Sequence, residues 1–217
     1  MLVKDRMTPN PICGSPDMHV TEVKNLMKEK NFRHMPILDE GGNLVGLVTQ
    51  RSLLRALPSD VTGFSRFEID YLLAKTKAKD VMRSVVKTID DNFSIEESAR
   101  IMADEKIGCL PVCNGEELVG IITDHDLFGI MVDLMGGRRK GVRMTVLMTD
   151  RAGMVSKLTA AIAAEGGNMT VFWGYPGPEP ETWISVAKVA KLDQEQLESI
   201  VSGLVDTTIL DIRETSG

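Results

Sequence analysis

Apolar and polar residues follow one another along this chain in short blocks that predict alternating helices and strands. Two predicted helices in the first half have apolar residues at the three- and four-residue spacing of one helical face. These residues are Val20, Val23, Leu26 and Met27 in one helix, and Ile95, Ala99, Ile101 and Met102 in the other. A short extended segment is predicted before each helix, at residues 11–13 and 85–89.

Each helix precedes two apolar runs joined by a glycine-containing turn, and this pattern predicts β-hairpins. The runs cover residues 35–38 and 44–49 in the first hairpin and residues 110–113 and 118–123 in the second. A short helix is expected to follow each hairpin, from about Ser52 and from Asp126. The predicted fold class is therefore α/β (α+β), with two βαββα units.

The two units are copies of one sequence. Residues 3–7 match residues 78–82 at a shift of 75 positions, and residues 43–49 match residues 117–123 after one deletion in the turn. A match of this length, with a single gap placed at a turn, indicates an internal duplication.

The pattern changes after residues 136–141, which are rich in glycine and basic residues and predict a solvated linker at a domain boundary. Beyond them, strands are predicted at residues 142–149, 169–173, 183–189 and 208–212, with a helix at 154–165. The residues from Asp193 to Gln196 have the sequence of a capping box, which predicts a second helix. The order is βαββαβ, a ferredoxin-like split unit.

Composition narrows the classes of function. A net charge of -6 argues against a general binder of nucleic acid or of anionic membranes. Cys13, Cys109 and Cys113 lack the spacing of metal ligands, so we expect no metal site. No signal peptide is apparent, and the longest apolar stretch, residues 127–135, is too short to span a bilayer. The cytoplasm is the expected compartment.

The stretch from Gly120 to Asp126 is the strongest candidate for ligand chemistry. It predicts a buried strand that ends at Thr123 and turns directly into a helix. Unsatisfied N–H groups at a helix start favour a phosphate, which the Thr123 hydroxyl could also contact. The Asp126 carboxylate could accept both hydroxyls of a ribose. The alternative is a capping box, in which these two side chains only stabilise the helix.

The two units resemble a tandem CBS-domain pair, a family named after cystathionine β-synthase. The resemblance covers residues 1–136 and rests on the paired Met-Pro-Ile and Leu-Pro-Val strands and on the Gly-x-x-Thr-x-x-Asp ending. It implies that an adenine nucleotide (AMP, ADP, ATP or S-adenosylmethionine) binds between the units, with Thr123 and Asp126 at the phosphate and ribose. The adenine-facing positions of the family fall on or near Val86, Thr88, Cys109, Pro111 and Ile122.

The resemblance sets the expected parts of the chain. These are a first CBS unit at residues 1–56, a connection at 57–77, a second CBS unit at 78–136, a linker at 137–141 and a further domain at 142–217. The connection is predicted to contain loop at residues 58–63 and a short amphipathic helix at 67–73.

The first copy departs from the family pattern at the ribose position. It ends in Thr49-Gln50-Arg51-Ser52, so a serine replaces the carboxylate. One hydroxyl cannot replace two acceptor oxygens, and we expect this cleft to bind a ribonucleotide weakly or not at all. Arg51 could contact a phosphate there or lie exposed on its helix.

The last 76 residues resemble an ACT domain, a small regulatory fold that binds amino acids. The resemblance rests on residues 150–155 before the first helix and on Gly-Gly-Asn-Met after it. It implies a ligand at the turn, usually where two domains pair, and its test positions are Asp150, Gly153, Met154 and Asn168. The alternative is a plain β-to-α turn in which Asp150 caps the helix.

The whole arrangement resembles bacterial acetoin-utilisation proteins of the AcuB type. It favours a homodimeric, non-catalytic regulatory sensor that binds a small molecule, with an unknown downstream protein target. An enzyme is disfavoured because we find no glycine-rich phosphate loop, nucleophile motif or metal-ligand cluster in the sequence. A third hypothesis is an assembly module in which both folds serve only as dimer surfaces.

Overall fold

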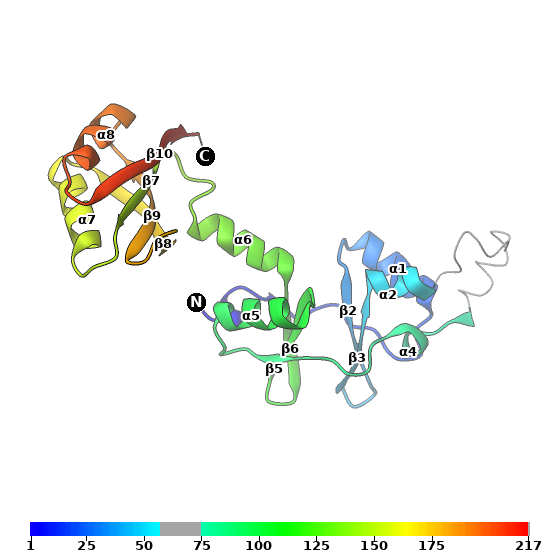
Figure 1. Cartoon of the computed structure of the whole chain (residues 1–217). Coiled ribbons are helices and arrows are strands. Elements are labelled where there is room, and N and C mark those ends of the chain that lie inside the picture. Colours follow the sequence, from blue (N-terminus) through cyan, green and yellow to red (C-terminus); the bar gives the residue numbers. More distant parts are fainter. Residues whose placement is uncertain (57–74, 217) are drawn as a thin grey trace. The chain divides into compact units, whose positions relative to one another are not determined.

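The computed structural model describes residues 1–56 and 75–216, which form two compact units, Met1–Leu127 and Phe128–Gly217 (Figure 1). The loop and helix predicted at residues 58–63 and 67–73 lie outside the described residues. Among the described helices, none is both long and apolar enough to cross a membrane.

The first unit contains both copies of the repeat, each with a helix, a hairpin and a second helix as the sequence predicts. The first copy has α1 (Val20–Glu29), β2 (His34–Leu38), β3 (Leu44–Thr49) and α2 (Gln50–Ala56). The second copy has β4 (Ile89–Asp90), α5 (Ile95–Glu105), β5 (Cys109–Asn114), β6 (Glu117–Thr123) and the start of α6 (Asp124–Leu134), which continues past the end of the first unit at Leu127. The helices form because their apolar faces are buried, as in α1, where Val20, Val23 and Met27 are inside.

The extended segments differ from the prediction. The strand expected at residues 11–13 is found earlier, as β1 (Thr8–Pro9), and residues 85–89 contribute only the start of β4. Asn10 has a φ of +47°, a left-handed conformation that ends the extended backbone before Pro11. Gly14 makes a single isolated bridge with Ile37.

The two copies exchange their leading segments. β1 pairs antiparallel with β6 of the second copy, through Thr8 with Ile121 and Pro9 with Gly120. The short helix η1 (Val3–Asp5) also joins the second copy, where the Val3 N–H donates to the Phe93 carbonyl at 2.8 Å. The N-terminal segment therefore completes the copy that follows it later in the chain.

The reciprocal segment completes the first copy. The helix α4 (Ala78–Val81) places Ala78 in the core around Val20 and Met35, and Arg83 bridges to Leu47 of β3. Added Cβ atoms at Gly46 and Gly120 would overlap the sulfur atoms of Met82 and Met7, respectively. The glycine of each Leu-Val-Gly-x-x-Thr motif thus lets the exchanged methionine approach closely, and a larger residue there would force that methionine to move.

The second unit has the predicted βαββαβ order. Its elements are β7 (Gly141–Thr149), α7 (Met154–Ala164), β8 (Asn168–Pro176), β9 (Thr182–Ala190), α8 (Gln194–Ser202) and β10 (Thr207–Thr215). The strands form one antiparallel sheet in the ferredoxin-like order β10-β7-β9-β8. Both helices contribute to one core, as Leu158 and Leu197 show. The capping box before α8 is confirmed, since the Gln196 N–H donates to the Asp193 Oδ1 at 2.8 Å.

A buried lysine holds the segment that the sequence indicates as a solvated linker. Lys188 is only 4% exposed, and its Nζ donates to the carbonyls of Gly136 and Arg139 at 2.7 and 2.6 Å. Burial, followed by the nearby charge of Arg143, lowers the pKa of Lys188. Arg139 in turn donates to the Thr170 carbonyl at 2.8 Å. Residues 136–139 are therefore bound to β8 and β9.

We predict that Lys188→Met destabilises the second unit by about 2 kcal/mol, because two carbonyl groups lose their donor while the buried stem is retained. Both tryptophans of the chain, Trp173 and Trp183, lie in this unit, so urea unfolding followed by tryptophan fluorescence measures it selectively. The matched control is Lys157→Met, which removes an exposed lysine and should change stability by less than about 0.5 kcal/mol. Equal stability of the two variants would contradict the role of Lys188.

Candidate ligand-binding clefts

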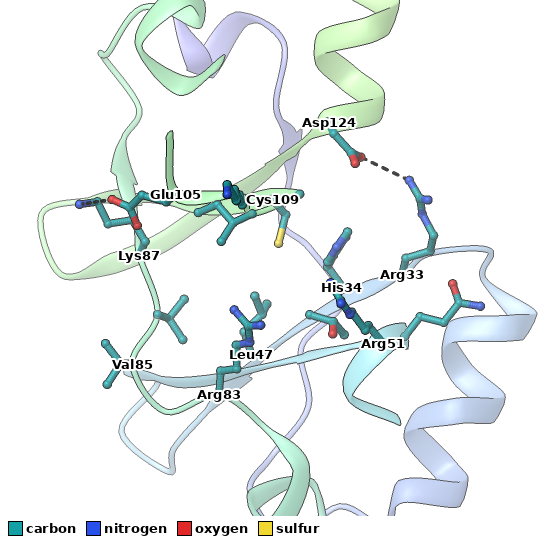
Figure 2. A pocket seen from close by; sticks show the side chains of 16 residues that line it. Arg33, His34, Leu47, Arg51, Arg83, Val85, Lys87, Glu105, Cys109 and Asp124 are labelled. Carbon is teal, nitrogen blue, oxygen red and sulfur yellow. Dashed lines mark hydrogen bonds and ion pairs between the residues drawn. The ribbon is translucent and has the colours of Figure 1, made fainter. Parts of the chain in front are cut away.

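The first unit contains two clefts that the sequence repeat relates to each other. The Thr123 cleft has a volume of about 550 Å3 and is lined by Thr8, Asn10, Pro11, Ile12, Lys30, Asn31, Phe32, Arg33, His34, Ile121, Thr123, His125 and Asp126. The Thr49 cleft (Figure 2) has a volume of about 620 Å3 and is lined by Arg33, His34, Leu47, Thr49, Gln50, Arg51, Arg83, Val85, Val86, Lys87, Glu105, Lys106, Ile107, Gly108, Cys109 and Asp124. Both volumes lie within the range of roughly 300–1,000 Å3 that is typical of small-molecule sites.

Thr123 and Asp126 are joined at the point where β6 ends and α6 begins. The Asp126 Oδ2 accepts hydrogen bonds from the Thr123 N–H at 2.8 Å and from its hydroxyl at 2.7 Å. The Asp126 N–H points back to the same hydroxyl at 3.4 Å. The capping geometry that the sequence left open is therefore formed. The second carboxylate oxygen, Oδ1, accepts no hydrogen bond from the described residues, which leaves it available to a ligand.

Thr49 and Ser52 form the same cap in the other copy but leave fewer hydrogen-bond acceptor positions free for a ligand. The Ser52 hydroxyl accepts from the Thr49 N–H at 3.0 Å and donates to the Thr49 carbonyl at 2.9 Å. The Ser52 N–H donates to the Thr49 hydroxyl at 3.0 Å. A hydroxyl has one donor and about two acceptor positions, so one acceptor position remains here. The two clefts thus share one helix cap and differ in the oxygen that the cap leaves free.

The structure does not bring the predicted nucleotide site together in one cleft. Val86 and Cys109 line the Thr49 cleft, whereas Thr123 and Asp126 line the Thr123 cleft. The cause is the segment exchange, because each cleft combines the cap of one copy with the leading segment of the other. The remaining three predicted positions line neither cleft: Thr88 is exposed, while Pro111 and Ile122 are buried.

The residues that face Thr123 and Asp126 were missed from the sequence, although a signal for them was present. Shifting Val86 and Cys109 back by 75 positions gives Pro11 and His34, and both line the Thr123 cleft. The repeat therefore identifies the counterpart of each lining residue. The repeat does not show that the residues lining a cleft opposite its helix cap come from the leading segment of the other copy.

Arg33 and His34 form a wall that both clefts share. The Arg33 guanidinium lies 3.4 Å from the Asp124 carboxylate, a contact drawn in Figure 2. Burial, followed by the charge of Arg33, lowers the pKa of His34, and the Asp124 carboxylate partly opposes this shift. His34 is therefore neutral at pH 7.

Cys109 is the only cysteine that lines either cleft within the described residues. Burial, and then the negative charge of Asp124, raises the pKa of its thiol to about 12, while Arg83 acts in the opposite direction. The thiol is therefore protonated at neutral pH. A protonated thiol is a poor nucleophile.

The predicted amino-acid positions in the second unit are also separated. Gly153 is the N-cap of α7 with a φ of +88° and no side-chain cap, so the alternative in which Asp150 caps the helix is wrong. Met154 is buried in the core, at 3% exposure, and cannot offer its side chain to a ligand. Asn168 pairs with Ala190, whereas the residue before Asp150, Thr149, pairs with Thr182. Eight steps along β9 separate these ends of the sheet by roughly 27 Å.

Comparison with known proteins identifies the repeated part of the chain. The family model named CBS domain matches residues 3–59 and 78–133. A solved structure of a protein assigned to acetoin utilization (AcuB) from Vibrio cholerae is 35% identical, with a TM-score of 0.53, over 64% of this chain and 95% of that chain.

Two further structures contain nucleotides or related compounds. The CBS domain pair of protein MJ0100, in complex with 5′-methylthioadenosine and S-adenosyl-L-methionine, is 26% identical with a TM-score of 0.53 over 64% of this chain and 98% of that chain. CBSX2 in complex with AMP is 28% identical with a TM-score of 0.50 over 61% of this chain and 96% of that chain.

We predict that the shared wall makes the first unit less stable in mild acid. Because the folded state lowers the pKa of His34, the unfolded chain takes up a proton first as the pH falls below about 6.5, and unfolding becomes more favourable. Calorimetric melting between pH 7.5 and 5.5 should therefore show a smaller loss of stability for His34→Gln than for the wild type. Identical pH profiles for the two proteins would refute this prediction.

Proposed function

The chain belongs to the CBS-domain family, and we propose that it is a non-catalytic regulatory protein that binds an adenine nucleotide in the Thr123 cleft. The observation that carries this proposal is the unused Oδ1 atom of Asp126 beside a cleft of about 550 Å3. A carboxylate oxygen has about two acceptor positions, and a ribose presents two neighbouring hydroxyl donors. The diol can therefore bind without breaking the cap of α6.

The rest of the cleft supports a nucleotide in a defined orientation. Pro11, Ile12 and Ile121 offer an apolar surface to a base. Lys30 and Arg33 line the same cleft and offer positive charge to a phosphate. The Thr123 hydroxyl already donates to Asp126, so it contacts a phosphate only by giving up that bond.

The similar structures support the ligand class. The MJ0100 pair holds adenosine derivatives and CBSX2 holds AMP, at identities of 26% and 28%. The 35% identity to the acetoin utilization protein supports a regulatory role in that metabolism as part of the same proposal.

Two other classes of function remain as outcomes of the test. An enzyme would require turnover of the bound nucleotide, and the protonated Cys109 thiol does not offer a nucleophile for it. An assembly module would form a stable dimer and bind no small molecule. A binding assay followed by analysis of the nucleotide for turnover separates these classes.

We predict that AMP or another adenine ribonucleotide stabilises the protein by about 2.7 kcal/mol when its concentration is about 100 times Kd. Asp126→Ser should weaken this binding by roughly 100-fold or more, because two hydrogen bonds to a charged acceptor are lost. Calorimetric titration with AMP, ADP, ATP and S-adenosylmethionine, together with thermal melting, measures both effects.

The variant supplies its own folding control, because it copies the Thr49–Ser52 cap that the first copy already forms. 2′-Deoxy-AMP should bind the wild type more weakly than AMP and should bind Asp126→Ser about as weakly as AMP does. Unchanged AMP affinity in Asp126→Ser would rule out Asp126 as the ribose acceptor.

We further propose that the second unit is an ACT-type domain that binds an amino acid between two copies of the chain. β8 is an edge strand of the sheet, and edge strands present unpaired backbone groups. Antiparallel pairing of β8 with a second β8 would place Asn168 of a second copy near Pro176, which is at the same end of the sheet as Asp150. A site made from Asp150 and Asn168 then requires a homodimer.

We predict that Asp150→Ala and Asn168→Ala each abolish the binding of an amino acid that the wild type binds. Mixed dimers purified through two different tags should regain one site per dimer, half the wild-type stoichiometry, because one of the two sites at the interface carries both substitutions and the other carries none. Calorimetric titration against the twenty amino acids measures the stoichiometry. A mixed dimer without binding would contradict a site shared between copies.

A further inference from the structure

The two clefts differ in charge at positions that the repeat makes equivalent. Four cationic residues of the Thr49 cleft have uncharged counterparts in the Thr123 cleft. The pairs are Arg83 with Thr8, Lys87 with Ile12, Lys106 with Asn31, and Arg51 with His125. The Thr49 cleft is thus the more cationic of two cavities built on the same plan.

Three of these cations are not neutralised by nearby acids. Lys87 forms an ion pair with Glu105 at 2.9 Å, and Arg33 forms one with Asp124. These are the two acidic residues that line the cleft. Within the part of the chain that the structure describes, Arg51, Arg83 and Lys106 make no ion pair. Figure 2 shows Arg51 and Arg83 around the same hollow as Cys109.

The backbone at Lys106 indicates that its charge is not incidental. Lys106 has a φ of +54°, and Asn31 at the equivalent position has a φ of +55°. Asparagine adopts this left-handed conformation more readily than lysine does. The second copy therefore carries the less favourable residue at a position that lines the cationic cleft.

The cap of the Thr49 cleft offers a ribose less than the cap of the Thr123 cleft does. The Ser52 hydroxyl accepts from and donates to Thr49, so it keeps one free acceptor position and cannot accept both hydroxyls of a diol. We propose that the Thr49 cleft binds a polyphosphate chain, free or as the tail of a nucleotide, through Arg51, Arg83 and Lys106. Guanidinium groups bind phosphate oxygens in a bidentate manner, and the lysine adds a compact third charge.

This site does not depend on nucleotide binding at Asp126. It selects for the number of phosphates, whereas the Thr123 cleft is proposed to select for a ribose. The three cations are exposed, so the attraction is weakened by salt, and binding has to be measured at physiological as well as low ionic strength.

The test is calorimetric titration of the full-length protein with sodium tripolyphosphate, pyrophosphate, phosphate and sulfate at matched ionic strength. We expect affinity to rise from phosphate to tripolyphosphate. Lys106→Asn and Arg83→Thr, which copy the residues of the other repeat, should each weaken tripolyphosphate binding roughly tenfold. Lys106→Asn also places the better-suited residue at the left-handed position, so loss of binding cannot be ascribed to misfolding.

Lys140→Asn is the matched control, because it removes one exposed lysine outside both clefts. It should leave tripolyphosphate binding unchanged. Equal weakening by Lys140→Asn and Lys106→Asn, or equal affinity for sulfate and tripolyphosphate, would overturn the proposal. The proposal would also be overturned if the Asp126→Ser variant bound ATP but did not bind tripolyphosphate. Tighter binding of ATP than of tripolyphosphate in that variant, with both lost in Lys106→Asn, would identify a nucleotide tail as the source of the chain.

Discussion

The first unit depends on the exchange of leading segments between its two copies. β1 completes the sheet of β5 and β6, and residues 78–83 complete the core and edge of the first copy. Gly46 and Gly120 permit this exchange because any side chain there would occupy the space of the exchanged methionine. Each cleft is consequently lined by both copies, and neither copy alone can form one.

One architectural plan therefore produces two sites of different chemistry. The helix cap is the same in both, but Asp126 leaves a carboxylate oxygen free where Ser52 leaves a single acceptor position. The cationic residues Arg83 and Lys106 line the other cleft, the one whose cap has Ser52 in place of Asp126. Because Arg33 and His34 border both clefts, a ligand in one can alter the charge that a ligand in the other meets.

Local pattern was sufficient to predict most of the elements but few of the contacts between distant residues. The helical spacing of Val20, Val23 and Met27 and the capping box at Asp193 are local signals, and both correspond to observed helices. Pairing of Thr8 with Ile121 has no local signal, so the sequence does not reveal that Val86 and Cys109 line the Thr49 cleft and not the cleft of Thr123. In the sequence, nothing distinguishes Lys188 from an exposed polar residue of a strand. Its burial follows from the packing of residues 136–139 over it. The separation of Asn168 from Asp150 likewise follows from sheet register.

The pairing of β1 with β6 also constrains how the chain acquires its structure during synthesis. Thr8 leaves the ribosome before its partner Ile121, which is 113 residues further along. At about 5–20 residues per second, the N-terminal segment waits roughly 6–23 seconds for that strand. The first copy meanwhile lacks Ala78 and Arg83, so neither repeat can finish folding on its own. The duplicated half of the protein is therefore expected to fold as one cooperative event late in translation, and chaperones that hold nascent chains would meet it with both cores still open.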